Sequence, residues 1–168
     1  MSDKPRDFQS ISPAACVRPF CPADTDEWKR LRHILWPETT EADHVADLAE
    51  YLSSPRTHLI LVAEAAEGRL AGIAEIRIRS HADGCYTSPV GYLEGWIVDL
   101  PYRRNGIGRA IVDAAEAWSR SCGCREFASD AYVENSISRA AHRSLGFQET
   151  SAVVRYWKKL DDRPSGSG

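Results

Sequence analysis

The sequence predicts one mixed α/β domain, with a mixed sheet covered by helices on both faces. Two observations carry this prediction. The expected elements follow the order strand, two helices, three strands, helix, strand, helix and strand, which suits a sheet packed between two helical layers. The chain has 168 residues, of which 43% are apolar and 27% charged, so it can bury one core.

The first third of the chain predicts one strand and two helices. Residues 17–20 suit a short strand, and Asp24 is expected to cap a helix that Pro37 ends. Residues 41–53 form a second predicted helix. Its buried face is expected to carry Val45, Leu48, Ala49 and Leu52.

Three strands are expected next. Residues 58–65 are almost continuously apolar, and residues 71–79 alternate apolar and polar side chains after a turn at 67–69, which predicts a hairpin. A loop over residues 80–89 leads into a strand that ends at Val98.

The last third predicts two helices and two strands. Apolar residues at helical spacing indicate a helix over 107–121, and residues 126–129 suit a short strand. A helix over 136–145 is closed by Gly146, and residues 153–159 are expected to form a last strand.

Residues 16–160 are predicted to be the domain, between an extended or disordered segment 1–15 and a flexible tail 161–168. No signal peptide or membrane-spanning run is visible, so no membrane partner is expected. Five cysteines form neither a disulfide framework nor a paired zinc pattern. We therefore expect a cytoplasmic protein without a metal.

Charge is distributed unevenly along the chain. Residues 1–98 carry 15 acids against 10 Lys and Arg, and residues 99–168 carry 9 against 11. Between residues 24 and 50 there are eight acids and three bases. This distribution argues against a nucleic-acid partner and favours cationic ligands, although a solvated helix surface is the simpler explanation of any single carboxylate.

The most informative segment is Arg103–Gly108, an Arg-x-x-Gly-x-Gly turn between a strand and a helix. Gly106 and Gly108 have no Cβ, so the backbone can approach an anion closely. The first N–H groups of the following helix are unpaired and can donate to phosphate oxygens. Glycines at such a junction more often mark only a tight turn, which is the alternative interpretation. The motif also lacks the P-loop lysine and the third glycine of a dinucleotide fingerprint, so it fits neither of these nucleotide motifs.

This turn, its flanking strand and helix, and Leu145-Gly146-Phe147 resemble the GCN5-related N-acetyltransferase (GNAT) superfamily over residues 16–160. The resemblance implies a central, mostly antiparallel, twisted sheet with helices on both faces. Further segments resemble the aminoglycoside 6'-N-acetyltransferases within it. They are Leu35-Trp36-Pro37, Asp83-Gly84-Cys85, Ser88-Pro89, Leu93-Glu94-Gly95, residues 123–130 and residues 134–138.

The resemblance implies that acetyl-CoA is the cofactor. The turn would hold its pyrophosphate, the strand before the turn would pair with the pantetheine arm, and Asn135 would hydrogen-bond that arm. The expected cofactor-binding residues are Trp96, Ile97, Val98, Arg103, Arg104, Asn105, Gly106, Ile107, Gly108, Arg109, Ala110 and Asn135.

Two carboxylates are candidates for contact with the acceptor amine. Glu94 lies in an apolar strand beside the expected cofactor site, and an unpaired carboxylate is costly to bury there. It is the first candidate for a catalytic base or ammonium anchor; the alternative is a salt bridge to an arginine such as Arg77. The resemblance assigns Asp130 to the acceptor's ammonium groups, and a local cap is its alternative.

Two further side chains complete the candidate site. His142 stands four residues before Gly146, where many superfamily members carry the tyrosine that protonates the departing thiolate. Histidine can donate a proton at physiological pH, although a packing role is the alternative. The resemblance places Trp36 against the aminoglycoside, where it would stack on a sugar ring or a cation; core packing is its alternative.

We therefore expect direct transfer of an acetyl group from acetyl-CoA to the 6'-amine of an aminoglycoside, an activity that confers antibiotic resistance. A polyamine or peptide acceptor is one alternative, and a non-catalytic CoA-binding module is another. The resemblance also implies a homodimer.

Overall fold

The computed structural model describes residues 15–65 and 68–160 and contains a five-stranded sheet in the order β1-β2-β3-β4-β5. The strands span Cys16–Pro19, His58–Glu64, Leu70–Arg79, Val90–Val98 and Phe127–Ser129. All neighbours are antiparallel except β4 and β5. The predicted mostly antiparallel sheet and the hairpin of β2 and β3 are confirmed.

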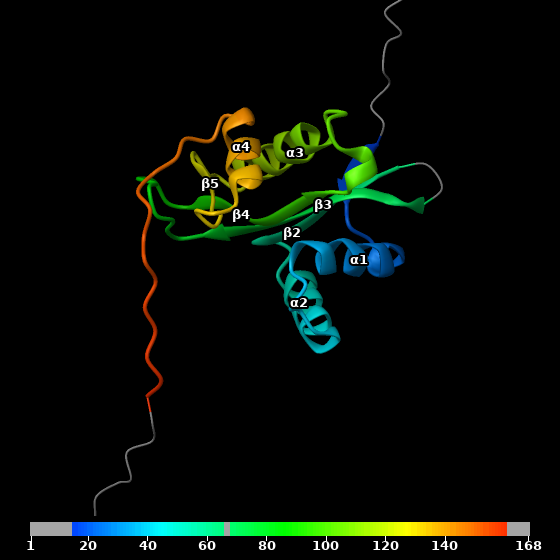
Figure 1. Cartoon of the computed structure of the whole chain (residues 1–168), viewed down its shortest axis with the longest axis horizontal. Helices are drawn as coiled ribbons and strands as arrows, with labels where there is room; N and C mark the ends of the chain where they lie inside the picture. The colour runs from blue at the N-terminus through cyan, green and yellow to red at the C-terminus, as the bar shows by residue number, and fades with distance from the viewer. Residues whose placement is uncertain (1–14, 66–67, 161–168) are drawn as a thin grey trace, which may run out of the picture.

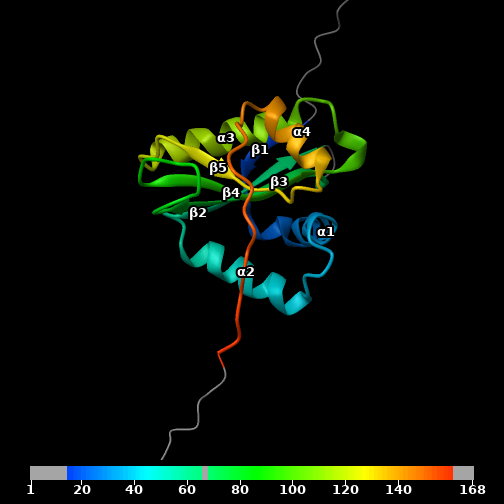
Figure 2. The same ribbon diagram turned by 60° about the vertical axis from the view of Figure 1, so that its left-hand side comes forward.

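Two helical layers enclose the sheet. α1 (Thr25–Leu35) and α2 (Glu41–Ser53) cover one face, and α3 (Ile107–Ser121) and α4 (Ser136–Ser144) cover the other (Figures 1 and 2). Each face has its own core. Trp28 and Leu31 of α1 pack with Ile73 on one face, and Ile111 of α3 packs with Ile76 and Leu93 on the other. The predicted helices on both faces are therefore confirmed.

β4 has an irregular register that matters for the site. Glu75 of β3 pairs with Gly95, and the next residue, Ile76, pairs with Leu93. Glu94 is therefore the extra residue of a β-bulge, a feature that redirects side chains and often lies beside active sites. On its other side, β4 pairs with β5 only from Gly91 to Leu93. Within the described residues, the rest of that edge of β4 has no partner strand.

Asp24 does not cap α1 as the sequence analysis expected. Its carboxylate makes no cap hydrogen bond to that helix, and a short 3-10 helix, Pro22–Asp24, precedes α1. The carboxylate instead accepts hydrogen bonds from the Cys21 N–H and from both terminal nitrogens of Arg18. A buried carboxylate gains more from a guanidinium than from one more backbone donor.

The buried face of α2 also differs from the expectation. Val45 and Leu52 are each 56% exposed, whereas His44 and Tyr51 are buried. The polar atoms of the buried pair find partners: His44 Nδ1 lies 3.2 Å from Arg32 Nη1, and the Tyr51 hydroxyl accepts from Arg77 Nε at 3.5 Å. The Arg77 guanidinium also lies over the Tyr51 ring. These contacts explain why α2 does not bury the face that carries only apolar side chains.

The predicted last strand, residues 153–159, is absent. Residues 151–160 instead leave the domain as an extended segment, drawn in orange to red in Figure 1. An extended segment becomes a strand only where another strand accepts its hydrogen bonds. None of the described strands lies beside this segment.

The predicted segments 1–15 and 161–168 lie outside the described residues except for Ala15. Among the helices that the structure describes, none has the length and apolar character needed to cross a membrane. The described residues also include no cluster of three or more His, Cys, Asp or Glu side chains arranged to hold a metal.

Candidate active site

The glycine turn opens directly onto the first turn of α3. Gly106 adopts the left-handed conformation, with φ of 78°, and stands immediately before the helix. The first helical bond runs from the Ala110 N–H to the Gly106 carbonyl, at 3.0 Å. The N–H groups before it have no helical carbonyl to bond, and the first turn contains no acid. The turn therefore suits an anion.

The second glycine allows α3 to approach β4. A Cβ on Gly108 would lie 2.8 Å from the Trp96 ring, closer than carbon atoms tolerate. The turn is thus held directly above the strand that leads into it. Arg103 reinforces this arrangement, because its Nε donates to the Val98 carbonyl at 2.8 Å.

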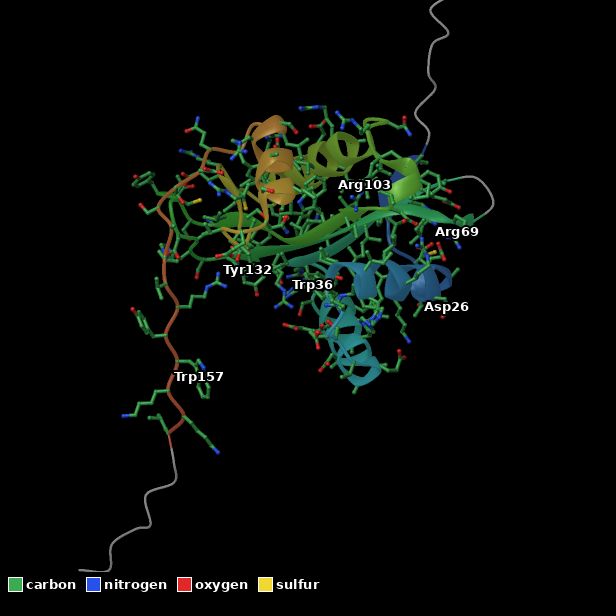
Figure 3. The ribbon with its side chains drawn as sticks, viewed as in Figure 1. Asp26, Trp36, Arg69, Arg103, Tyr132 and Trp157 are labelled. Atoms are coloured by element: carbon green, nitrogen blue, oxygen red, sulfur yellow. The ribbon has the colours of Figure 1, made fainter. Side chains whose placement is uncertain are left out.

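The rest of the predicted cofactor set surrounds the same turn. Arg104, Asn105, Arg109 and Ala110 are exposed, and Ile107 anchors the start of α3 in the core. Arg103 lies on the α3 side of the sheet in Figure 3. The backbone of residues 96–98 follows the unpartnered edge of β4. An extended arm and a pyrophosphate fit this combination of free strand edge, small residues and basic side chains.

Glu94 is paired with arginines, as the alternative interpretation expected. The main partner is Arg79, whose Nε donates to Oε1 at 2.9 Å and whose Nη2 donates to Oε2. Arg77 Nε lies farther away, at 3.8 Å from Oε1. Arg79 also lies over the Tyr92 ring, 3.5 Å from its centroid. Both oxygens of the candidate base are therefore occupied by a cation.

Asp130 follows β5 and is also neutralised by an arginine. Its Oδ1 accepts from the Tyr92 hydroxyl and its Oδ2 from Arg155, each at 2.9 Å. Partial burial raises the pKa of Asp130, but these hydrogen bonds lower it further, so its pKa lies below the usual range. The pKa of Tyr92 is raised to about 12 by burial and by the neighbouring carboxylate. The local cap considered for Asp130 does not form.

His142 lies on α4, with its ring against the rings of Trp96 and Phe147 and close to Ser129 of β5. Its Nδ1 is 2.8 Å from the Ser138 carbonyl, which can only accept, so Nδ1 carries a hydrogen. Its Nε2 is 3.0 Å from Ser129 Oγ. Ser129 Oγ donates its one hydrogen to the Leu93 carbonyl at 3.0 Å, so toward Nε2 it can act as an acceptor, and only the imidazolium has an Nε2 proton to donate.

Asn135 and Trp36 each make a contact within the protein and can also contact a ligand. Asn135 begins α4, and its side-chain oxygen accepts from the Ser138 N–H at 3.0 Å, while its amide group remains a donor. Trp36 ends α1 below the sheet (Figure 3) and is half-buried. Its ring lies against Gly95, where a Cβ would meet it at 2.4 Å. This contact places Trp36 beside Glu94.

Sequence analysis missed four residues of this site: Arg79, Tyr92, Ser129 and Arg155. The sequence analysis named Arg77 as a partner for Glu94, whereas the closer partner is Arg79, two residues farther along the same face of β3. The bulge at Glu94 decides between them, and no residue pattern announced it. Arg155 reaches Asp130 from a segment expected to be a strand, so no spacing linked the two.

Comparison with known proteins identifies the family. A profile described as the acetyltransferase (GNAT) family matches residues 28–147. An aminoglycoside N(6')-acetyltransferase type 1 from Klebsiella aerogenes is 43% identical over 146 residues, which cover 86% of this chain and 96% of that protein. One from Stenotrophomonas maltophilia is 41% identical over 152 residues, covering 90% and 97%.

Solved structures agree with the sequence comparison. The aminoglycoside 6'-N-acetyltransferase AAC(6')-IG from Acinetobacter haemolyticus has a TM-score of 0.81 at 39% identity, covering 87% of this chain and 99% of that one. AAC(6')-Iy in complex with the bisubstrate analogue CoA-S-monomethyl-acetylneamine has a TM-score of 0.81 at 35% identity, with the same coverage. The chain therefore belongs to the GNAT acetyltransferase family.

Proposed function

We propose that this protein transfers the acetyl group of acetyl-CoA directly to the 6'-amine of aminoglycoside antibiotics. One observation carries the proposal: the glycine turn and the free edge of β4 lead directly to Glu94, which lies beside Trp36. The similarity to aminoglycoside N(6')-acetyltransferases over most of the chain supports the acceptor class.

The cofactor half of the site is expected to bind and orient. The N–H groups at the start of α3 donate to the pyrophosphate, with Arg103, Arg104 and Arg109 nearby. Backbone groups of residues 96–98 and the Asn135 amide hold the arm. Bound acetyl-CoA supplies an activated thioester, and holding it beside the acceptor lowers the entropic part of the barrier.

Glu94 accepts the proton that the acceptor amine must lose, directly or through a water. At neutral pH a free alkylammonium is mostly protonated, so this proton needs an acceptor. Because Arg79 holds both oxygens of Glu94 in the free protein, an acceptor ammonium must take its place. A polycationic aminoglycoside suits this exchange, since one cation replaces another.

Asp130 and Trp36 are expected to orient the rest of the acceptor. Asp130 binds a second ammonium group after exchange with Arg155, and Trp36 provides an apolar surface. On the other side of the reaction, imidazolium His142 releases its Nε2 proton toward the departing thiolate, directly or by way of Ser129. Ser129 Oγ lies 3.0 Å from both Nε2 and the Leu93 carbonyl.

The experiment is to measure CoA release from acetyl-CoA with kanamycin or tobramycin as acceptor, and to identify the acetylated nitrogen by NMR. Turnover with acetylation at the 6'-amine is expected. Protein that binds acetyl-CoA but turns over only with a polyamine or a peptide amine would replace the proposed acceptor. Binding without turnover on any amine would indicate a non-catalytic module.

We also propose that two copies form a homodimer through residues 151–160. Large apolar side chains in this segment are 64 to 91% exposed: Val153, Val154, Tyr156, Trp157 and Leu160. Figure 3 places Trp157 on this segment, beyond the domain. β5 is an edge strand of three residues, and a groove of about 390 Å³ runs beside it. A strand from a second copy matches both features.

Sedimentation velocity tests this assembly. The protein is expected to sediment as a dimer, and removal of residues 151–168 is expected to give a folded monomer. A monomeric full-length chain at micromolar concentration would contradict the proposal.

All five cysteines are free in the structure, which supports the proposed location in the reducing cytoplasm.

A further inference from the structure

A buried arginine stands behind Trp36 and connects it to the core. Arg32 lies one helical turn after Trp28 and one before Trp36, so the three side chains share a face of α1. The guanidinium carbon is 4.8 Å from the Trp28 ring centroid and 4.9 Å from that of Trp36. Only 5% of the Arg32 surface is exposed.

Three polar groups hold the Arg32 guanidinium in this position. Nε forms an ion pair with Glu75 Oε1 at 2.7 Å, and Nη2 donates to Asp47 Oδ2 at 2.7 Å. Nη1 lies 3.2 Å from His44 Nδ1, and because guanidinium only donates, Nδ1 is the acceptor. Burial and the arginine charge lower the pKa of His44, in agreement with a neutral ring.

This arrangement has a cost that core packing alone does not require. Buried ion pairs lose the hydration of both charges, and an apolar pair of similar volume is often as stable. Here the cation contacts both tryptophan rings, and Glu75 also accepts from the Trp28 indole N–H at 3.1 Å. One face of the Trp36 ring therefore lies against a rigid, planar cation.

We propose that Arg32 is a positioning residue that fixes the Trp36 ring for acceptor binding. This inference rests on the proposed function, in which Trp36 contacts the aminoglycoside. The guanidinium stacks on Trp36, and its polar contacts to Glu75, Asp47 and His44 transmit the rigidity of β3 and α2 to that ring. Trp36 in turn lies against Gly95, next to Glu94.

The stacked guanidinium also restricts which part of the acceptor can bind to Trp36. A ring that already carries one cation has a weaker attraction for a second, because the two positive charges repel. We therefore assign a neutral sugar ring of the acceptor to Trp36, and leave the ammonium groups to Glu94 and Asp130. The Trp36 contribution should then depend little on salt, unlike the contributions of the two carboxylates.

The test compares Arg32→Met, Trp36→Phe and the double variant in steady-state kinetics. Arg32→Met is expected to raise the acceptor KM about tenfold, while the KM for acetyl-CoA changes less than twofold. In the Trp36→Phe background the same replacement is expected to add little, since Arg32 acts through Trp36. Each effect should persist at high salt.

Arg32→Lys keeps the charge but cannot stack and reach three partners together, so it is expected to show part of the same KM increase. It also carries the test if Arg32→Met does not fold. Arg18→Met is the matched control, because Arg18 pairs with Asp24 and Glu64 away from Trp36. It should lower stability and leave the acceptor KM unchanged.

A second readout does not require turnover. Acrylamide quenching of the Trp36 fluorescence, taken as the difference between each protein and its Trp36→Phe form, should increase in Arg32→Met. Unchanged quenching together with an unchanged acceptor KM would overturn the role of Arg32. Absence of aminoglycoside turnover in the unmodified protein would instead overturn the proposed function, and the quenching result would still decide the position of Trp36.

Discussion

The two halves of the candidate site are built in different ways. Apart from Asn135, the cofactor half comes from one continuous stretch, residues 96–110, and uses mainly backbone N–H groups and the space left by two glycines. The acceptor half draws Trp36, Glu94 and Asp130 from three separate elements, and each of these side chains contacts an arginine. The first half is a local backbone geometry, whereas the second is a network of charges brought together by the fold. Substitutions in the two halves should therefore affect different kinetic and binding parameters.

Glu94→Gln should have the largest effect. It removes the proposed proton acceptor while retaining its size, so kcat is expected to fall about 10²-fold or more. Calorimetry should show unchanged CoA binding, because the cofactor half is untouched. Glu50→Gln is the control, since Glu50 also pairs with an arginine of β3, Arg77. An unaffected kcat in Glu94→Gln would remove Glu94 from the mechanism.

Gly108→Val tests the cofactor half. The new side chain would begin 2.8 Å from the Trp96 ring and push the start of α3 away from β4. The KM for acetyl-CoA is expected to rise about 10- to 100-fold, since small displacements of a binding group are costly. The affinity for the acceptor should change little. Equal losses for both substrates would mean that the two halves are not separable.

Asp130→Asn addresses the charge of the acceptor half. Loss of one charge-assisted contact to an ammonium group is expected to raise the acceptor KM about tenfold. The effect should shrink as salt is raised from 50 mM to about 1 M, where exposed charges are screened. Asp26→Asn, an exposed acid at the far end of α1, is the control. A salt-independent change would contradict an ionic role.

Glu75→Gln gives a smaller effect that concerns stability. Burial raises the pKa of Glu75 to about 7, with Arg32 and Trp28 opposing that rise. The folded protein then binds more protons than the unfolded chain between about pH 4.5 and 7. The contribution of Glu75 to the free energy of unfolding is present below that window and is lost as pH rises through 7.

Denaturant unfolding from pH 5 to 8 measures this slope. Unmodified protein should lose stability relative to Glu75→Gln as pH rises, since Gln does not titrate. Arg32 pairs with this carboxylate, His44 and Asp47 contact Arg32, and all three residues are shared by both proteins. A parallel pH dependence in the two proteins would show that Glu75 does not titrate in this range.

Much of the fold followed from local patterns. The bounds of α2 and α3 were predicted to the residue, because apolar spacing and a glycine turn act within one or two turns of chain. The prediction of the buried face of α2 was wrong, because Arg32 of α1 and Arg77 of β3 contact His44 and Tyr51 of this helix. The strand predicted at 153–159 is absent for a similar reason: β-branched and aromatic residues make a segment suitable for a sheet but supply no neighbouring strand.

The candidate site divides along the same line. The sequence by itself determined the glycine turn, the strand that leads into it and the helix that follows, because hydrogen bonding and steric space there are set by adjacent residues. Only the tertiary structure decided that Glu94 is the extra residue of a bulge facing Arg79, that Arg155 reaches Asp130, and that Arg32 lies between two tryptophans. The ion pairs among those contacts join residues 15 to 43 positions apart, and the two tryptophans contact the same buried guanidinium. The energies of these contacts depend on distance and burial, which no local sequence pattern encodes.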